Sequence, residues 1–74
     1  MSTWQRLGIT IRRLRDERGL TQAELAARAK LSLVFIRKVE QGARMPSWLT
    51  LQEIARVLGT TVDVSLRRRR KRRR

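Results

Sequence analysis

The sequence predicts an all-α fold of four to five short helices, and three observations support this. Apolar residues recur every three or four positions in four segments of the chain, as they do on the buried face of a helix. Thr or Ser stands where several of these segments begin, and Gly stands where three of them end, and these are residues that cap helices. The chain has 74 residues, which is enough for one hydrophobic core and too few for two.

The first helix is predicted over residues 3–18. Its apolar side chains form a single stripe and are expected to face the core: Trp4, Leu7, Ile11 and Leu14. The charged side chains lie away from this stripe and are expected in solvent: Arg12, Arg13, Arg15, Asp16 and Glu17. Gly19 suits the left-handed backbone position that ends a helix.

Residues 21–42 predict two short helices joined by a tight turn. Thr21 and Glu24 have the spacing of a capping box, which would begin a helix over 22–29. Ser32 can cap a second helix over 33–41, and Gly42 would end it. Ala26 lies where the two helices must touch, because steeply crossing helices at short range leave room for little more than a methyl group.

A fourth helix is predicted after the loop 43–46, and Gly59 would end it. Ser47 and Thr50 are both able to cap it, since Thr50 and Glu53 have the spacing of another capping box. The buried face of this helix is predicted to consist of Leu51, Ile54, Ala55 and Leu58. The first and fourth helices are expected to hold the central pair from behind.

Residues 60–66 change from helical to alternating spacing and are rich in β-branched side chains, which favours a strand. A single strand on a helical body would leave both edges unpaired. It could pair with the same strand of a second chain across a two-fold axis and so form a dimer. A fifth short helix is the alternative.

The net charge of +13 is distributed unevenly. Residues 67–74 hold eight of the 19 basic residues, so the other 66 residues carry 11 basic and six acidic side chains, a net charge of +5. We expect the 67–74 segment to be a disordered polybasic tail, because adjacent cations repel one another and bury no apolar surface. A polyanion is its natural partner.

The composition excludes several classes of function. The chain has no Cys and no His, which removes disulfides, thiolate metal sites and the commonest general base. No acid and base residues converge on a common face, so we predict no enzyme, no catalytic residue, no metal and no cofactor. No apolar run reaches the roughly 20 residues of a membrane span, and no signal peptide is evident, so a cytoplasmic protein is expected.

The segment TQAELAARAKLSLVFIRKVEQG resembles the helix-turn-helix of the Cro and phage-repressor (Xre-type) family. The residues in register with the family pattern are Thr21, Gln22, Glu24, Leu25, Ala26, Ser32, Ile36, Glu40 and Gly42. The resemblance continues through Pro46, Ser47 and the run 51–55 to Gly59, and so covers most of residues 7–64. Lys30 departs from it, because the family usually has Gly in the turn. If Lys30 must adopt a positive φ, the cost is on the order of 1 kcal/mol.

The resemblance implies a repressor-like DNA-binding domain over residues 1–66, with the helix-turn-helix at 21–42 and a helix at 33–41 that enters the major groove. The base-contacting residues would be Ser32, Leu33, Val34, Arg37 and Lys38. The phosphate-contacting residues would be Gln22, Arg44 and Ser47. Phe35, Ile36 and Val39 would turn inward, and Glu40 would have a structural role, bonding locally near the loop.

The sequence therefore predicts a sequence-specific DNA-binding transcriptional regulator, a homodimeric repressor whose partner is double-stranded DNA. Two alternatives remain. One is an antitoxin, similar to the HipB-like members of this family, which would bind a toxin or another protein and also repress its own operon. The other is a basic protein that coats nucleic acid without sequence preference, mainly through residues 67–74. Apolar Leu33 and Val34 could pack on thymine methyl groups or against a protein partner.

Overall fold

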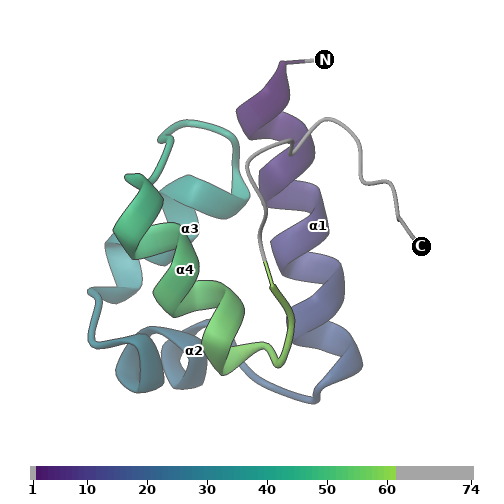
Figure 1. Ribbon diagram of the computed structural model, residues 1–74, viewed down its shortest axis with the longest axis vertical. Helices are drawn as coiled ribbons and strands as arrows, with labels where there is room; N and C mark the ends of the chain where they lie inside the picture. The colour runs from purple at the N-terminus through teal and green to yellow at the C-terminus, as the bar shows by residue number, and fades with distance from the viewer. Residues whose placement is uncertain (1, 62–74) are drawn as a thin grey trace, which may run out of the picture.

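The computed structural model describes residues 2–61, and within this range the chain forms four helices and no strand. They are α1 (Thr3–Glu17), α2 (Gln22–Ala29), α3 (Leu33–Glu40) and α4 (Trp48–Val57). Figure 1 shows α1 along one side of the molecule, with the three shorter helices grouped beside it. The predicted all-α fold is confirmed. The predicted strand or fifth helix at 60–66 lies outside the described residues except for Thr60 and Thr61, which belong to no helix or strand. The predicted disordered tail at 67–74 lies wholly outside them.

The core is formed by one face of each helix and by the turn after α1. Contacts join α1 to α3, α2 to α3, and α2 to α4. Ala26, Ile36 and Val39 are buried as predicted, as is the whole predicted face of the fourth helix, and α1 contributes Ile11. The full set is Ile11, Leu20, Leu25, Ala26, Ala29, Ile36, Val39, Leu51, Ile54, Ala55 and Leu58. Leu7 and Leu14 are half-buried against this core.

Two predictions for α1 are wrong. The side chain of Trp4 was expected in the core, but Trp4 is 47% exposed. Trp4 is the second residue of α1, so the apolar stripe continues there to a part of the helix that the core does not cover. Arg15 was expected in solvent but is buried, because it donates a hydrogen bond to the carboxylate of Glu40 on α3.

Every helix begins with a hydroxyl side chain that accepts a hydrogen bond from the backbone N–H three residues later. The four residues are Ser2, Thr21, Ser32 and Ser47. At α4 this decides between the two predicted caps, since Ser47 Oγ accepts from Thr50 N at 3.2 Å. Thr50 already lies within α4, so it does not cap the helix with Glu53, and Glu53 pairs with Arg56 at 2.8 Å. Ser2 and Gln5 form a capping box that begins α1.

The four helices also end alike, with two backbone hydrogen bonds that close a Schellman motif. Glycines occupy the left-handed position after α1, α3 and α4, but Lys30 occupies it after α2, with φ 60° and ψ 43°. The bonds there are Leu31 N to Ala26 O, 2.8 Å, and Lys30 N to Ala27 O, 3.2 Å. Lys30 therefore adopts the positive φ considered for it above, at the position where the family usually has Gly.

Gly8 lies in the middle of α1, where that helix crosses the end of α3. A Cβ atom at Gly8 would lie 2.5 Å from the carbonyl oxygen of Val39 and 2.7 Å from that of Glu40. Both atoms belong to backbone and cannot move aside easily. The close approach of α1 and α3 therefore depends on the absence of a side chain at residue 8. No helix in residues 2–61 is long and apolar enough to cross a membrane.

Candidate nucleic-acid interface

The turn between α2 and α3 holds the two helices of the predicted helix-turn-helix in close contact. Ala26 and Ala29 are buried on α2, and their small side chains permit the approach. Ile36 and Val39 anchor α3, and both are completely buried. Helix α3 is therefore fixed along one side and leaves its other side free.

The free side of α3 is basic at its C-terminal half and apolar at its start. Arg37 and Lys38 are exposed, as predicted for residues that contact bases. Val34 is 57% exposed, which fits its predicted place in the groove. Leu33 and Phe35 are both half-buried, so Leu33 is less open than expected and Phe35 less enclosed.

Two of the predicted contact residues already have a local partner. Ser32 Oγ accepts a hydrogen bond from Phe35 N at 3.0 Å, and this cap begins α3. Ser47 Oγ accepts from Thr50 N and donates to Thr50 Oγ1 at 3.0 Å. Both hydroxyl groups therefore fix the N-terminus of a helix, which carries a partial positive charge that attracts anions.

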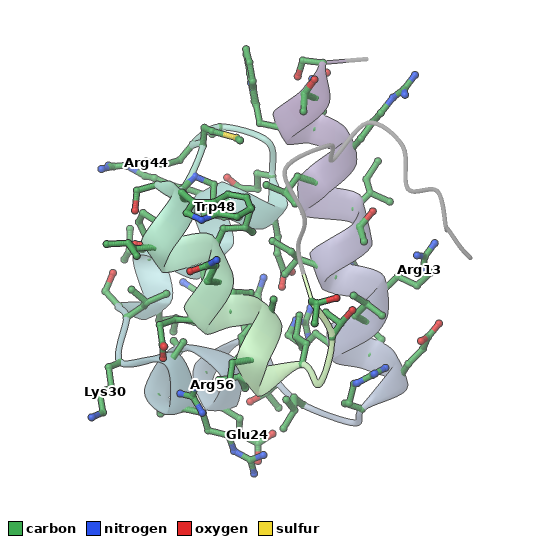
Figure 2. All side chains as sticks on the ribbon, viewed as in Figure 1. Arg13, Glu24, Lys30, Arg44, Trp48 and Arg56 are labelled. Carbon is green, nitrogen blue, oxygen red and sulfur yellow. The ribbon has the colours of Figure 1, made fainter. Side chains whose placement is uncertain are left out.

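Arg44 lies in the loop between α3 and α4 and is exposed. Its guanidinium carbon lies 5.3 Å from the centre of the Phe35 ring, a distance typical of a cation–π contact. Figure 2 shows Arg44 and Trp48 in the upper half of the view, with Lys30 and Glu24 near the bottom. The loop therefore places one basic side chain beside the N-terminus of α4.

Gln22, at the first position of α2, belongs to a buried polar network. Its Nε2 donates to Glu40 Oε1 at 3.1 Å, and Arg15 donates to the same carboxylate at 2.7 and 3.0 Å. Arg15 also donates to the carbonyl oxygen of Leu20 at 2.9 Å. Its bond to Glu40 raises the pKa of Arg15, against the opposing effect of burial. The prediction that Glu40 bonds locally near its loop is wrong, since its partners come from α1 and α2.

The burial of Arg15 and its pairing with Glu40 were not predicted, although the sequence holds a signal for the burial. Leu7, Ile11 and Arg15 are spaced by four residues, so Arg15 continues a buried row on α1. A lone carboxylate at Glu40, close to the inward-facing Val39, was the complementary signal. Spacing alone could not pair two residues that stand 25 positions apart.

In the described part of the chain, some exposed cations form salt bridges and others do not. Asp16 and Glu17 pair with arginines of α1 and the turn after it, and Glu53 pairs with Arg56 on α4. No salt bridge among residues 2–61 involves the three cations of the α3 face and its loop, which are Arg37, Lys38 and Arg44. These positive charges remain available to an anionic ligand.

Comparison with known proteins agrees with this geometry. Residues 6–67 match the family described as a helix-turn-helix domain. The uncharacterized HTH-type transcriptional regulator y4dJ of Sinorhizobium fredii is 42% identical over 55 residues, which are 74% of this chain and 71% of that protein. The immunity repressor protein of Bacillus phage phi105 is 39% identical over 57 residues, 77% of this chain but only 40% of that repressor. The crystal structure of the clp gene regulator ClgR from Corynebacterium glutamicum matches with a TM-score of 0.82 at 27% identity, over 84% of this chain and 80% of that chain.

Proposed function

The chain belongs to the helix-turn-helix domain family, as the match over residues 6–67 and the 42% identical relative establish, and we propose that it represses transcription as a homodimer on operator DNA. The family is one of DNA-binding regulators and not of enzymes. The proposal concerns how this chain binds, which residues make contact, and with what symmetry.

The observation that carries the proposal is the division of α3 into a fixed side and a free basic side. Ile36 and Val39 are completely buried, while Arg37 and Lys38 are exposed and make no salt bridge within the described residues. A rigid helix with unpaired cations on its outer side suits the major groove, which admits one α-helix. Lys38 can donate to guanine O6 and N7, and Arg37 can reach a base or a phosphate.

The remaining contacts follow from the same orientation. We assign base contact to Ser32, Leu33, Val34, Arg37 and Lys38. The apolar pair at the start of α3 would pack on thymine methyl groups, which favours A·T pairs in part of the half-site. We assign phosphate contact to Gln22, Arg44 and Ser47, which stand at the starts of α2 and α4 and in the loop between α3 and α4.

Dimerisation completes the proposal. One α3 covers only a few base pairs, and regulators with this motif gain affinity and specificity from two half-sites about 34 Å apart. Trp48 and Leu49 are exposed at the start of α4, and Leu49 is 74% exposed. An apolar surface of this kind is suited to a contact between subunits. The expected operator is therefore a palindrome with half-sites one helical turn apart.

The test compares two pairs of substitutions that remove the same charge. The first pair is Arg37→Gln with Lys38→Gln on α3. The matched control is Arg12→Gln with Arg13→Gln on α1, both exposed, and Figure 2 shows Arg13 on the side of α1 that faces away from the other helices. A duplex is first selected from random sequences and then titrated at two salt concentrations.

We expect the α3 pair to weaken binding to the selected duplex by at least about tenfold and to reduce its discrimination against an unrelated duplex. The control pair should leave discrimination unchanged. Affinity of the unaltered protein should fall steeply with salt, because neutralised phosphates release counterions. Equal losses in both pairs, or affinity that does not change with salt, would contradict the proposal.

A second candidate, the antitoxin that also represses its own operon, is favoured by the apolar side chains beside the basic surface. Val34, Met45, Trp48 and Leu49 are all exposed. A toxin that co-purifies with the chain, or is encoded next to it, would support this candidate. A third, general coating of nucleic acid, is separated by deletion of residues 67–74, because a coating protein would then lose nearly all binding and a regulator would keep its operator preference.

A further inference from the structure

Phe35 and Arg44 form a contact between α3 and the loop that follows it. The guanidinium carbon of Arg44 lies 5.3 Å from the centre of the Phe35 ring. Phe35 is half-buried and packs against the core, so the ring is held from below. Arg44 is exposed, and it lies two residues beyond Gly42, which ends α3 with φ 76°. The ring therefore supports a side chain that would otherwise be free to move.

The contact leaves the hydrogen-bonding capacity of Arg44 unused, since no side-chain hydrogen bond among residues 2–61 involves its N–H groups. A guanidinium group carries five N–H donors in a planar fork and can contact an aromatic face without using them. These N–H groups match two phosphate oxygens in a bidentate arrangement. No carboxylate competes for Arg44 in the salt bridges of residues 2–61.

We propose that Phe35 is a positioning residue for DNA binding, which holds Arg44 in the orientation that contacts a backbone phosphate. The inference rests on the proposed function and adds a residue to it. A free Arg side chain loses much of its rotamer freedom when it binds, and an arginine that is already ordered loses less. Because Phe35 belongs to α3, its contact with Arg44 also couples the binding of phosphate by Arg44 to the position of α3 in the groove.

The size of the effect follows from the strength of an exposed cation–π contact. An exposed cation–π contact that orders Arg44 before DNA binds, and persists in the complex, should change the affinity for DNA by about two- to fivefold. The effect should depend entirely on Arg44. This dependence distinguishes positioning from a direct contact between Phe35 and DNA.

The test is a double-substitution cycle with Phe35→Leu and Arg44→Gln, measured as Kd for the selected duplex at two salt concentrations. Leu keeps apolar packing against the core but offers no ring face. We expect Phe35→Leu to weaken binding about two- to fivefold when Arg44 is present and to have no effect in the Arg44→Gln background. Arg44→Gln should reduce the slope of log affinity against log salt by about one, and Phe35→Leu should leave that slope unchanged. Phe35→Tyr, which keeps the ring, should bind as the unaltered protein does.

A second measurement, by NMR without DNA, tests the contact even if Phe35→Leu folds poorly, because it uses the unaltered protein and Phe35→Tyr. Ring currents should move the Cδ proton resonances of Arg44 upfield in the unaltered protein and in Phe35→Tyr. Unshifted Arg44 protons, or an equal loss of affinity from Phe35→Leu in both backgrounds, would overturn the inference. A chain that binds every duplex equally would refute the proposed function itself, and that result appears in the first titration, before any substitution is made.

Discussion

The guanidinium group of Arg15 and the carboxylate of Glu40, 25 residues apart, are joined by two hydrogen bonds of 2.7 and 3.0 Å. The side chains of this pair are only 10% and 4% exposed. Gln22 donates to the same carboxylate, and Arg15 also holds the carbonyl of Leu20. One ion pair thus connects α1, the turn before α2, the start of α2 and the end of α3. It sets the position of α3 relative to the rest of the domain.

Substitution of one partner of this pair should destabilise the fold strongly. Glu40→Leu leaves the buried Arg15 guanidinium without its counter-charge, a change that typically costs about 3–5 kcal/mol. The free energy of unfolding, measured with urea, should fall by an amount of this order. The double substitution Arg15→Met with Glu40→Leu should recover much of the loss, since it leaves no unpaired charge. A loss below about 1 kcal/mol for Glu40→Leu would show that the pair contributes little.

Gly8→Ala should destabilise the fold although alanine favours helices. Alanine in place of glycine within a helix normally contributes roughly 0.5–1 kcal/mol of stability. At residue 8 its Cβ would lie 2.5 Å from the carbonyl oxygen of Val39, so α1 and α3 must separate. We expect a net loss of about 1–3 kcal/mol in urea unfolding, by analogy with overpacked cores. Arg12→Ala, on the exposed side of the same helix, serves as the control and should change stability little.

Lys30→Gly should stabilise the protein. Lys30 has φ 60°, where a side chain costs roughly 1–2 kcal/mol and glycine costs nothing. The greater freedom of glycine in the unfolded chain offsets part of this gain. A rise of about 0.5–1 kcal/mol in the free energy of unfolding is expected, visible as a higher Tm. Lys30→Ala keeps the strain and should not reproduce the rise; an equal rise would mean that loss of the lysine charge is the cause.

Stability should decrease in acid because two exposed carboxylates are favoured in their ionised form. The backbone N–H of Thr21 lowers the pKa of Glu24, and the side-chain hydrogen bond from Arg56 lowers the pKa of Glu53, both from an ordinary value of 4.5. A lowered pKa in the folded state contributes stability above the pKa of the unfolded chain, and this is lost as the pH falls through the folded value. Tm should therefore be level near neutral pH and decline below about pH 4.5.

Glu24→Gln isolates one of these groups. Glutamine can still accept the hydrogen bond from Thr21 in a capping box, but it does not titrate. The decline of Tm below about pH 4.5 should become shallower in this variant, while Tm near neutral pH changes little. An unchanged acid profile would assign the decline to other carboxylates.

Much of the fold follows from local signals in the sequence. The capping residues Thr21 and Ser32 act within three residues, so the helices that they begin could be placed correctly. The periodicity of the apolar residues gave the right core for α4, and Ile36 and Val39 of α3 are buried as expected. These features depend on neighbours along the chain, and such neighbours can be seen in a sequence.

The errors and the omissions concern features that depend on which parts of the fold meet. Arg15 is buried because of Glu40, and Gly8 matters because the carbonyl oxygens at the end of α3 approach it. Trp4 continues an apolar stripe but lies in the first turn of α1 and stays half exposed. Each of these requires knowledge of which surfaces or side chains meet.

The free side of α3 should enter DNA, and an NMR titration is the decisive measurement. Backbone amide resonances of the full chain are followed while the selected duplex is added. If α3 lies in the major groove, the largest shifts should fall at residues 32–38, with others at Gln22 and at 44–48. A duplex that binds and shifts resonances elsewhere, while those of the α3 amides stay as in the free protein, would contradict this mode of binding.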